Sequence, residues 1–151
     1  MTSIKNGFIS GGLATYVAGS MLLVNNALHS FPEVRFARTL AGILGSPDDV
    51  MIGVATILIT GIFVIGVLYA VFAPRLPIRS YFAKSLALAA VSWLLIMVVF
   101  MPLGGVGLFG LERSPVVPVA MLVLNLAYWL VLGMSYYWLT KSGSQPDQVK
   151  T

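Results

Sequence analysis

Four long runs without a charged residue constrain this chain more than any other feature. Asp, Glu, Lys, Arg and His are all absent from residues 7–28, 50–74, 85–111 and 114–140. Each run exceeds the roughly 20 residues that an α-helix needs to cross about 30 Å of hydrocarbon. Transmembrane β-strands are only about 9 to 11 residues long and alternate in polarity, a pattern that these runs lack. We therefore expect an all-α fold, a four-helix transmembrane bundle with spans at about 7–28, 50–73, 83–103 and 115–140.

The composition supports the same fold class. Only 9% of the 151 residues are charged, whereas soluble domains carry roughly 25%. Four spans leave no length for a separate soluble domain, so residues 1–151 are expected to form a single membrane domain. The net charge of +4 comes from basic residues scattered singly beside the apolar runs. The sequence has no stripe of basic residues of the kind that binds nucleic acid.

The positions of the basic residues predict the orientation. Six of them lie on the side of the chain ends, namely Lys5, Arg75, Arg79, Lys84, Lys141 and Lys150, and three lie on the other side, namely Arg35, Arg38 and Arg113. Because Lys and Arg accumulate in cytoplasmic loops, both termini are expected in the cytoplasm. The first apolar run exceeds the 7 to 15 residues, roughly, of a signal-peptide core and lacks an Ala-x-Ala site, so we interpret it as a span.

The link between the first two spans predicts a short helix at about 31–45 that lies in the outer interface. Ser30 is a plausible N-cap and Gly45 a plausible end. One face is expected to be apolar, with Phe36, Leu40, Ile43 and Leu44. The link between the third and fourth spans, residues 102–115, is apolar and rich in glycine, which predicts an irregular loop. The polar residues 142–151 predict a flexible tail.

Residues that could carry out chemistry are missing from the predicted spans. The chain has no cysteine and one histidine, His29 at a helix end, which excludes thiol chemistry and haem held by a pair of histidines. No span contains the buried carboxylate that proton-coupled small exporters use. We therefore predict no catalytic residue, no cofactor and no metal site, and a protein that is not an enzyme.

Two groups of residues are candidates for helix packing. Gly7, Gly11, Ala14, Ala18 and Asn25 form a stripe along the first span, where small residues let helix backbones approach closely. The neighbouring helix could belong to this chain or to another. Asn125, in the middle of the fourth span, is expected to form a hydrogen bond between helices, or alternatively to contribute a polar contact to a ligand path.

The two outer links carry apolar groups that should not all remain in water. Phe36, Leu40, Leu108 and Phe109 are therefore candidates for contact with a partner or with lipid. The same residues could instead cap the end of the bundle.

The overall pattern resembles an uncharacterised family of small bacterial four-helix membrane proteins. The resemblance rests on a first span rich in small residues (Gly11-Gly-Leu-Ala-Thr15), the short outer helix, the ending of the third span at residues 101–110 and the fourth span at 122–133. The histidine that this family often has near the start of its second span is absent here. Membership implies the bacterial inner membrane and no established activity.

Two functions follow as hypotheses. The first is a non-catalytic accessory or structural subunit that packs against a larger membrane complex, such as a respiratory or photosynthetic assembly. The alternative is a small oligomeric transporter or channel with Asn125, Asn25 and the threonines as its polar path. The expected partners are membrane lipid and a second membrane protein or further copies of the chain, and no nucleic acid.

Overall fold

Four membrane-spanning helices make up the fold. The computed structural model describes residues 2–28 and 35–142, and this part of the chain is helical, with turns and no strand. Four helical stretches are long and apolar enough to cross a membrane, namely Ile4–Asn25, Val50–Arg75, Tyr81–Leu103 and Val117–Ser142. The expected all-α bundle is confirmed. The predicted flexible tail, His29 and Ser30 lie outside the described residues, apart from Ser142.

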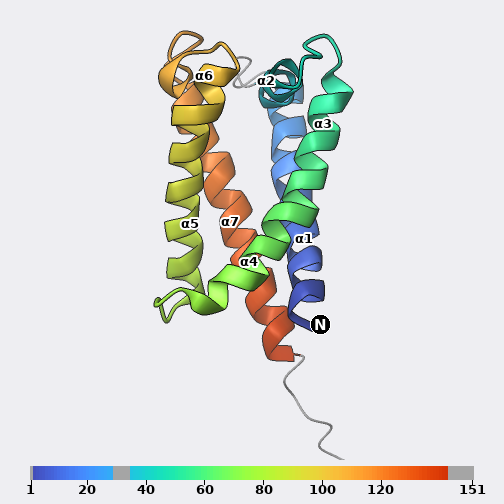
Figure 1. Cartoon of the computed structure of the whole chain (residues 1–151), viewed down its shortest axis with the longest axis vertical. Coiled ribbons are helices and arrows are strands. Elements are labelled where there is room, and N and C mark those ends of the chain that lie inside the picture. Colours follow the sequence, from blue (N-terminus) through green and yellow to red (C-terminus); the bar gives the residue numbers. More distant parts are fainter. Residues whose placement is uncertain (1, 29–34, 143–151) are drawn as a thin grey trace, which may run out of the picture.

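The first and fourth spans are uninterrupted helices, whereas the second and third are built from pieces. The first span is α1 (Thr2–Leu28) and the fourth is α7 (Val117–Ser142). The second joins α3 (Val50–Ile59), the π-helical η1 (Thr60–Ile65), α4 (Gly66–Phe72) and the 3₁₀ turn η2 (Ala73–Arg75), and the third joins α5 (Tyr81–Leu95), the π-helical η3 (Ile96–Phe100) and α6 (Met101–Leu103). The start of α1 and the end of α7 lie at the same end of the molecule (Figure 1).

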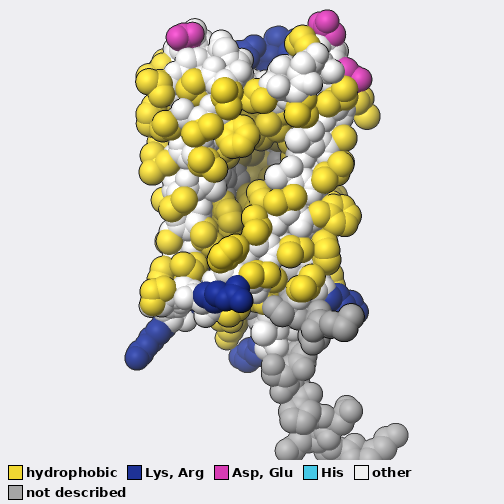
Figure 2. Space-filling model, in the orientation of Figure 1, with side chains coloured by type: hydrophobic (Ala, Val, Ile, Leu, Met, Phe, Trp, Pro, Cys, Tyr) yellow, Lys and Arg dark blue, Asp and Glu magenta, His cyan; other side chains and the backbone are white. Residues whose placement is uncertain are grey.

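The surface has the charge distribution of a membrane protein. Hydrophobic side chains cover the sides in Figure 2, and charged side chains gather at the two ends. The end that carries the start of α1 and the end of α7, here called the basic end, has Lys5, Arg75, Arg79, Lys84 and Lys141. Among the described residues the acidic side chains belong to Asp48, Asp49 and Glu112, all in the links at the opposite, outer end.

Glycines bring α1 against the second span with almost no separation between the backbones. A Cβ atom on Gly7 would lie 2.5 Å from the Gly66 carbonyl oxygen, and one on Gly11 would lie 2.8 Å from the Gly61 carbonyl oxygen. Any side chain larger than hydrogen would therefore force the two helices apart. Such contact matters in lipid, where van der Waals packing takes over from the hydrophobic effect as the force that joins helices.

The second span changes direction where it meets α1. Its π-helical segment η1 widens the turn at Thr60–Ile65, and α4 then crosses obliquely toward the lower end of α5 (Figure 1). π-helical turns bend helices and release backbone carbonyls from the regular ladder. As a result Tyr69 of α4 lies in the core, packed among Trp129 and Tyr136 of α7.

Proline explains the second π-helical segment. Pro102 has no N–H, and its ring clashes with the carbonyl of the fourth residue before it in a regular helix. The widened turn η3 directly precedes it and accommodates the ring. The third span ends one residue later, at Leu103, as the sequence predicts.

The outer end is closed by a short helix and a glycine-rich loop. The short helix, α2 (Phe36–Ile43), ends in a Schellman motif, in which Gly45 has a φ of +79° and Ser46 N donates to the Ala41 carbonyl at 2.9 Å. Asp49 then caps α3 by accepting from Met51 N at 3.0 Å. In the loop, η4 (Leu108–Gly110) forms one turn, with Phe109 at a φ of 58°.

Adjacent glycines of α1 give a matched test of this packing. Gly11→Leu should destabilise the protein by at least about 1–3 kcal/mol, because the new side chain meets backbone that has no room to move. Gly12→Leu should change stability by less than about 0.5 kcal/mol, because a Cβ at Gly12 meets nothing within 4 Å. The measurement is the unfolding midpoint in mixed micelles. Equal midpoints for the two variants would show that α1 does not pack as described.

Candidate functional site

A polar cluster joins the third and fourth spans near mid-membrane. Ser92 donates its hydroxyl hydrogen toward Asn125 Oδ1 at 2.9 Å, and Trp129 Nε1 donates to Ser92 Oγ at 2.6 Å. Ser92 comes from α5, and its two partners lie one helical turn apart on α7. Asn125 is half-buried, and its amide oxygen is held by a hydrogen bond between helices. Such a bond stabilises the bundle.

A tyrosine hydroxyl ties α7 to the bend in the second span. Tyr128 donates to the Gly61 carbonyl oxygen at 2.7 Å. Gly61 lies in η1, where the π-helical register leaves carbonyls available. This bond explains how an irregular turn persists in a medium that offers no water to satisfy a released carbonyl.

At the basic end, Lys84 is turned into the protein. Its side chain is only 6% exposed and its Nζ donates to the Ala73 carbonyl oxygen, while the Tyr81 ring lies 5.1 Å away. Ala73 is in the last turn of the second span, where carbonyls lack partners within the helix. Lys84 therefore acts as a cap that joins the second and third spans.

The outer candidates divide into two groups. Phe36 and Phe109 are half-buried and pack against the cluster of Met97, Met101, Val117 and Met121, and the Phe109 ring meets Trp93 at 5.7 Å. Leu40 is half-buried, whereas Leu108 is 60% exposed. The two phenylalanines thus cap the bundle, and Leu108 is the candidate that faces outward.

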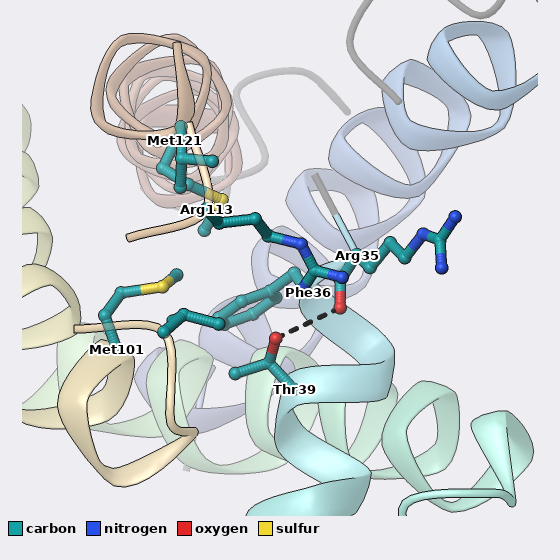
Figure 3. A pocket seen from close by; sticks show the side chains of 8 residues that line it. Arg35, Phe36, Thr39, Met101, Arg113 and Met121 are labelled. Atoms are coloured by element: carbon teal, nitrogen blue, oxygen red, sulfur yellow. Dashed lines mark hydrogen bonds between the residues drawn. The ribbon is translucent and has the colours of Figure 1, made fainter. Parts of the chain in front are cut away.

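A small cavity lies beneath this cap. It encloses about 10 Å³ between α2, α6 and the start of α7. Figure 3 shows the Arg113 side chain extending toward the first turn of α2, while the Arg35 side chain points away. The cavity holds about one water-sized group, so it is too small for a substrate. Among the described residues no group of three His, Cys, Asp or Glu is placed to hold a metal ion.

The opposite side of α1 is unusual for a lipid-facing surface. Gly12, Tyr16, Gly19 and Leu23 follow one another at spacings of four, three and four residues and form what we call the exposed α1 face. A Cβ at Gly12 or Gly19 would meet nothing within 4 Å, and Tyr16 is 74% exposed. Tyr16 is twelve residues after Ile4 and nine before Asn25, about 18 Å and 14 Å from the two ends of the span at 1.5 Å per residue.

No hydrogen-bond partner of the Tyr16 hydroxyl is found within the part of the chain that the structure describes. Ser20, one turn away, bonds the Tyr16 carbonyl instead, at 2.9 Å. A phenol at mid-membrane without a partner is costly, since the hydrocarbon offers neither donors nor acceptors. The exposed α1 face therefore combines an unsatisfied polar group with two positions where another backbone could come close.

The packing candidates from the sequence lie in three places. Gly7, Gly11 and Ala14 are buried in α1, and the two glycines meet the second span. Ala18 is half-buried further along the helix. Asn25 is half-buried near the outer end and takes part in an interaction there. Tyr16 is not among the residues predicted from the sequence, although a tyrosine four residues from one glycine and three from another was a visible signal.

A comparison with family models covers nearly the whole chain. Residues 1–147 match the model of a family of unknown function (DUF6789). The chain belongs to the DUF6789 family. The expected resemblance to an uncharacterised family is thereby confirmed. Searches of curated proteins and of solved structures give no significant match, so the DUF6789 chain takes no function from a relative.

The polar cluster of this DUF6789 protein can be tested with a double-mutant cycle. Ser92→Ala and Asn125→Leu should each destabilise the protein, and their coupling energy should be about 0.6–1.7 kcal/mol, the range for hydrogen bonds between membrane helices. Ser20→Ala serves as control, because Ser20 bonds its own helix. A coupling energy of zero would mean that the side chains of Ser92 and Asn125 do not interact.

Proposed function

We propose that this protein is a non-catalytic accessory subunit that packs against a larger membrane complex, such as a respiratory or photosynthetic assembly, through the exposed α1 face. The observation that carries the proposal is the Tyr16 hydroxyl, 74% exposed at mid-membrane and without a partner in the described chain. A neighbouring helix that accepts or donates a hydrogen bond would satisfy this group.

The geometry of the glycines supports the same face. Within the chain, α1 uses Gly7 and Gly11 to approach the second span. Gly12 and Gly19 likewise lack a side chain on the other side of α1, where no described residue lies within 4 Å of the position that a Cβ would take. Small residues spaced along one helix face permit backbone contact, which gives helices in lipid their van der Waals energy.

The transporter alternative has less support. Its proposed path needs polar side chains that are open to a solute, yet Asn125 is bonded to Ser92 and Thr56 donates to its own helix at the Ile52 carbonyl. The described spans contain no Asp, Glu or His, the residues that commonly mark ion and proton paths. Contact with another chain through the exposed α1 face is the feature that both functions share.

The proposed location is the bacterial inner membrane with both termini in the cytoplasm. Support comes from the excess of basic residues, five at the end that carries the start of α1 and the end of α7 against three, Arg35, Arg38 and Arg113, in the outer links.

Single cysteines test this orientation, since the chain has none of its own. Pro77→Cys, in the exposed loop at the basic end, should react with an impermeant maleimide only after the cells are opened. Asp48→Cys, in the exposed outer link, should react in intact cells. The reverse pattern would contradict the proposed orientation.

Co-purification tests the proposed function. Tagged protein is extracted from native membranes in a mild detergent, and the membrane proteins that accompany it are quantified by mass spectrometry. Gly12→Leu with Gly19→Leu should lower the recovery of a partner at least tenfold, whereas Ala90→Leu, an exposed position on α5, should leave it unchanged. All variants should keep the wild-type unfolding midpoint, because both glycines face open space.

Three results would count against the proposal. The wild-type protein could migrate as a monomer that no other protein accompanies. The glycine variants could retain every partner. A complex made only of copies of this chain would favour the oligomeric transporter, which solute flux in liposomes then tests.

A further inference from the structure

A groove at the basic end lies between the start of α5 and the last turns of α7. Its volume is about 470 Å³, within the range of sites that hold small molecules. Phe82 and Trp138 flank it and are more than half exposed, and Leu130 and Met134 contribute further apolar surface. The groove therefore offers an apolar surface to whatever occupies the adjoining leaflet.

Glycine sets the floor of the groove. Gly133 of α7 packs against Ser85 of α5 so closely that a Cβ at this glycine would collide with the Ser85 hydroxyl and lie 2.9 Å from the Tyr69 hydroxyl. The hydroxyl groups at the floor already have partners, since those of Tyr69 and Ser85 lie 3.4 Å apart and Ser85 also donates to the Tyr81 carbonyl at 3.0 Å. None of these floor groups needs a polar ligand, so the floor can accommodate a hydrocarbon chain.

The mouth of the groove is positively charged. Arg79 lines it and is exposed, and Lys141 lies beside it on α7, with its Nζ 5.9 Å from the ring of Tyr137, another lining residue. Lys84, the neighbouring cation on α5, is turned away toward the Ala73 carbonyl. The described acidic residues all lie at the outer end, so no described carboxylate neutralises Arg79 or Lys141.

We propose that this groove binds one anionic phospholipid, whose phosphate lies between Arg79 and Lys141 and whose acyl chain runs along Leu130 and Met134. Basic pockets between transmembrane helices recognise anionic head groups by charge. Tyr137 and Trp138 lie at the depth where aromatic rings contact head groups. The apolar groove explains why the ligand is a lipid, and the two cations explain why it is an anionic one.

Binding to delipidated protein in detergent tests the proposal, with phosphatidylglycerol and phosphatidylcholine as the probes. Native mass spectrometry counts the bound lipid, and the unfolding midpoint reports stabilisation. Phosphatidylglycerol should bind with a stoichiometry of one and raise the midpoint. Arg79→Gln and Lys141→Gln should each weaken binding about fivefold, the effect of one cation near a membrane surface.

Two further variants separate the parts of the site. Arg75→Gln is the matched control, because Arg75 lies at the same end, does not line the groove and donates to its own helix at the Val71 carbonyl. It should bind phosphatidylglycerol like the wild type. Met134→Trp, at an exposed position, should fill the groove and reduce binding while both cations remain.

The outcomes decide the proposal in either direction. Equal binding of the two phospholipids, or an equal loss with Arg75→Gln and Arg79→Gln, would show only non-specific attraction and would overturn it. If Arg79→Gln weakened phosphatidylglycerol binding but Met134→Trp did not, the proposal would also be overturned, because the head group would then bind without the groove. Full competition by inorganic phosphate would overturn it as well, because the phosphate group would then bind without the acyl chain. Unchanged lipid-free midpoints of the four variants confirm that they fold.

Discussion

The close contact between α1 and the second span is the interaction on which the other features depend. Gly7 and Gly11 face Gly61 and Gly66 with hardly any separation between the backbones, and lipid supplies no hydrophobic force that would replace this packing. The contact lies where η1 bends the second span, so α4 is directed across the bundle and places Tyr69 against α7. Tyr128 completes the arrangement by satisfying the Gly61 carbonyl in the bend.

Polar groups within the described spans are used mainly to join helices. Asn125, Ser92 and Trp129 connect the third and fourth spans, and Lys84 closes the end of the second. These bonds fix the geometry of the bundle. Two surface features are not explained by the fold itself, namely the exposed α1 face and the groove between α5 and α7.

The sequence predicts the number, position and class of the spans, because long charge-free runs have one stable solution in lipid. It also predicts the end of the third span at Pro102 and the turn at Gly45, where proline and glycine chemistry is local. Pairing between helices is not local. The sequence marks Gly7 and Gly11 as small, but it does not say that Gly61 and Gly66 face them or that η1 bends between those two glycines. The role of Phe109 in the outer cap and of Tyr16 on an uncovered face likewise depends on how whole helices are placed.

Site-specific photo-cross-linking in native membranes tests the central claim, that the exposed α1 face contacts another protein. A benzophenone amino acid is placed at Tyr16, and in a control at Leu68, an exposed position on α4. The account predicts a discrete adduct with a second polypeptide from position 16 and only lipid adducts from position 68. Lipid adducts alone at both positions would contradict it, because Tyr16 would then face the bilayer and not a partner.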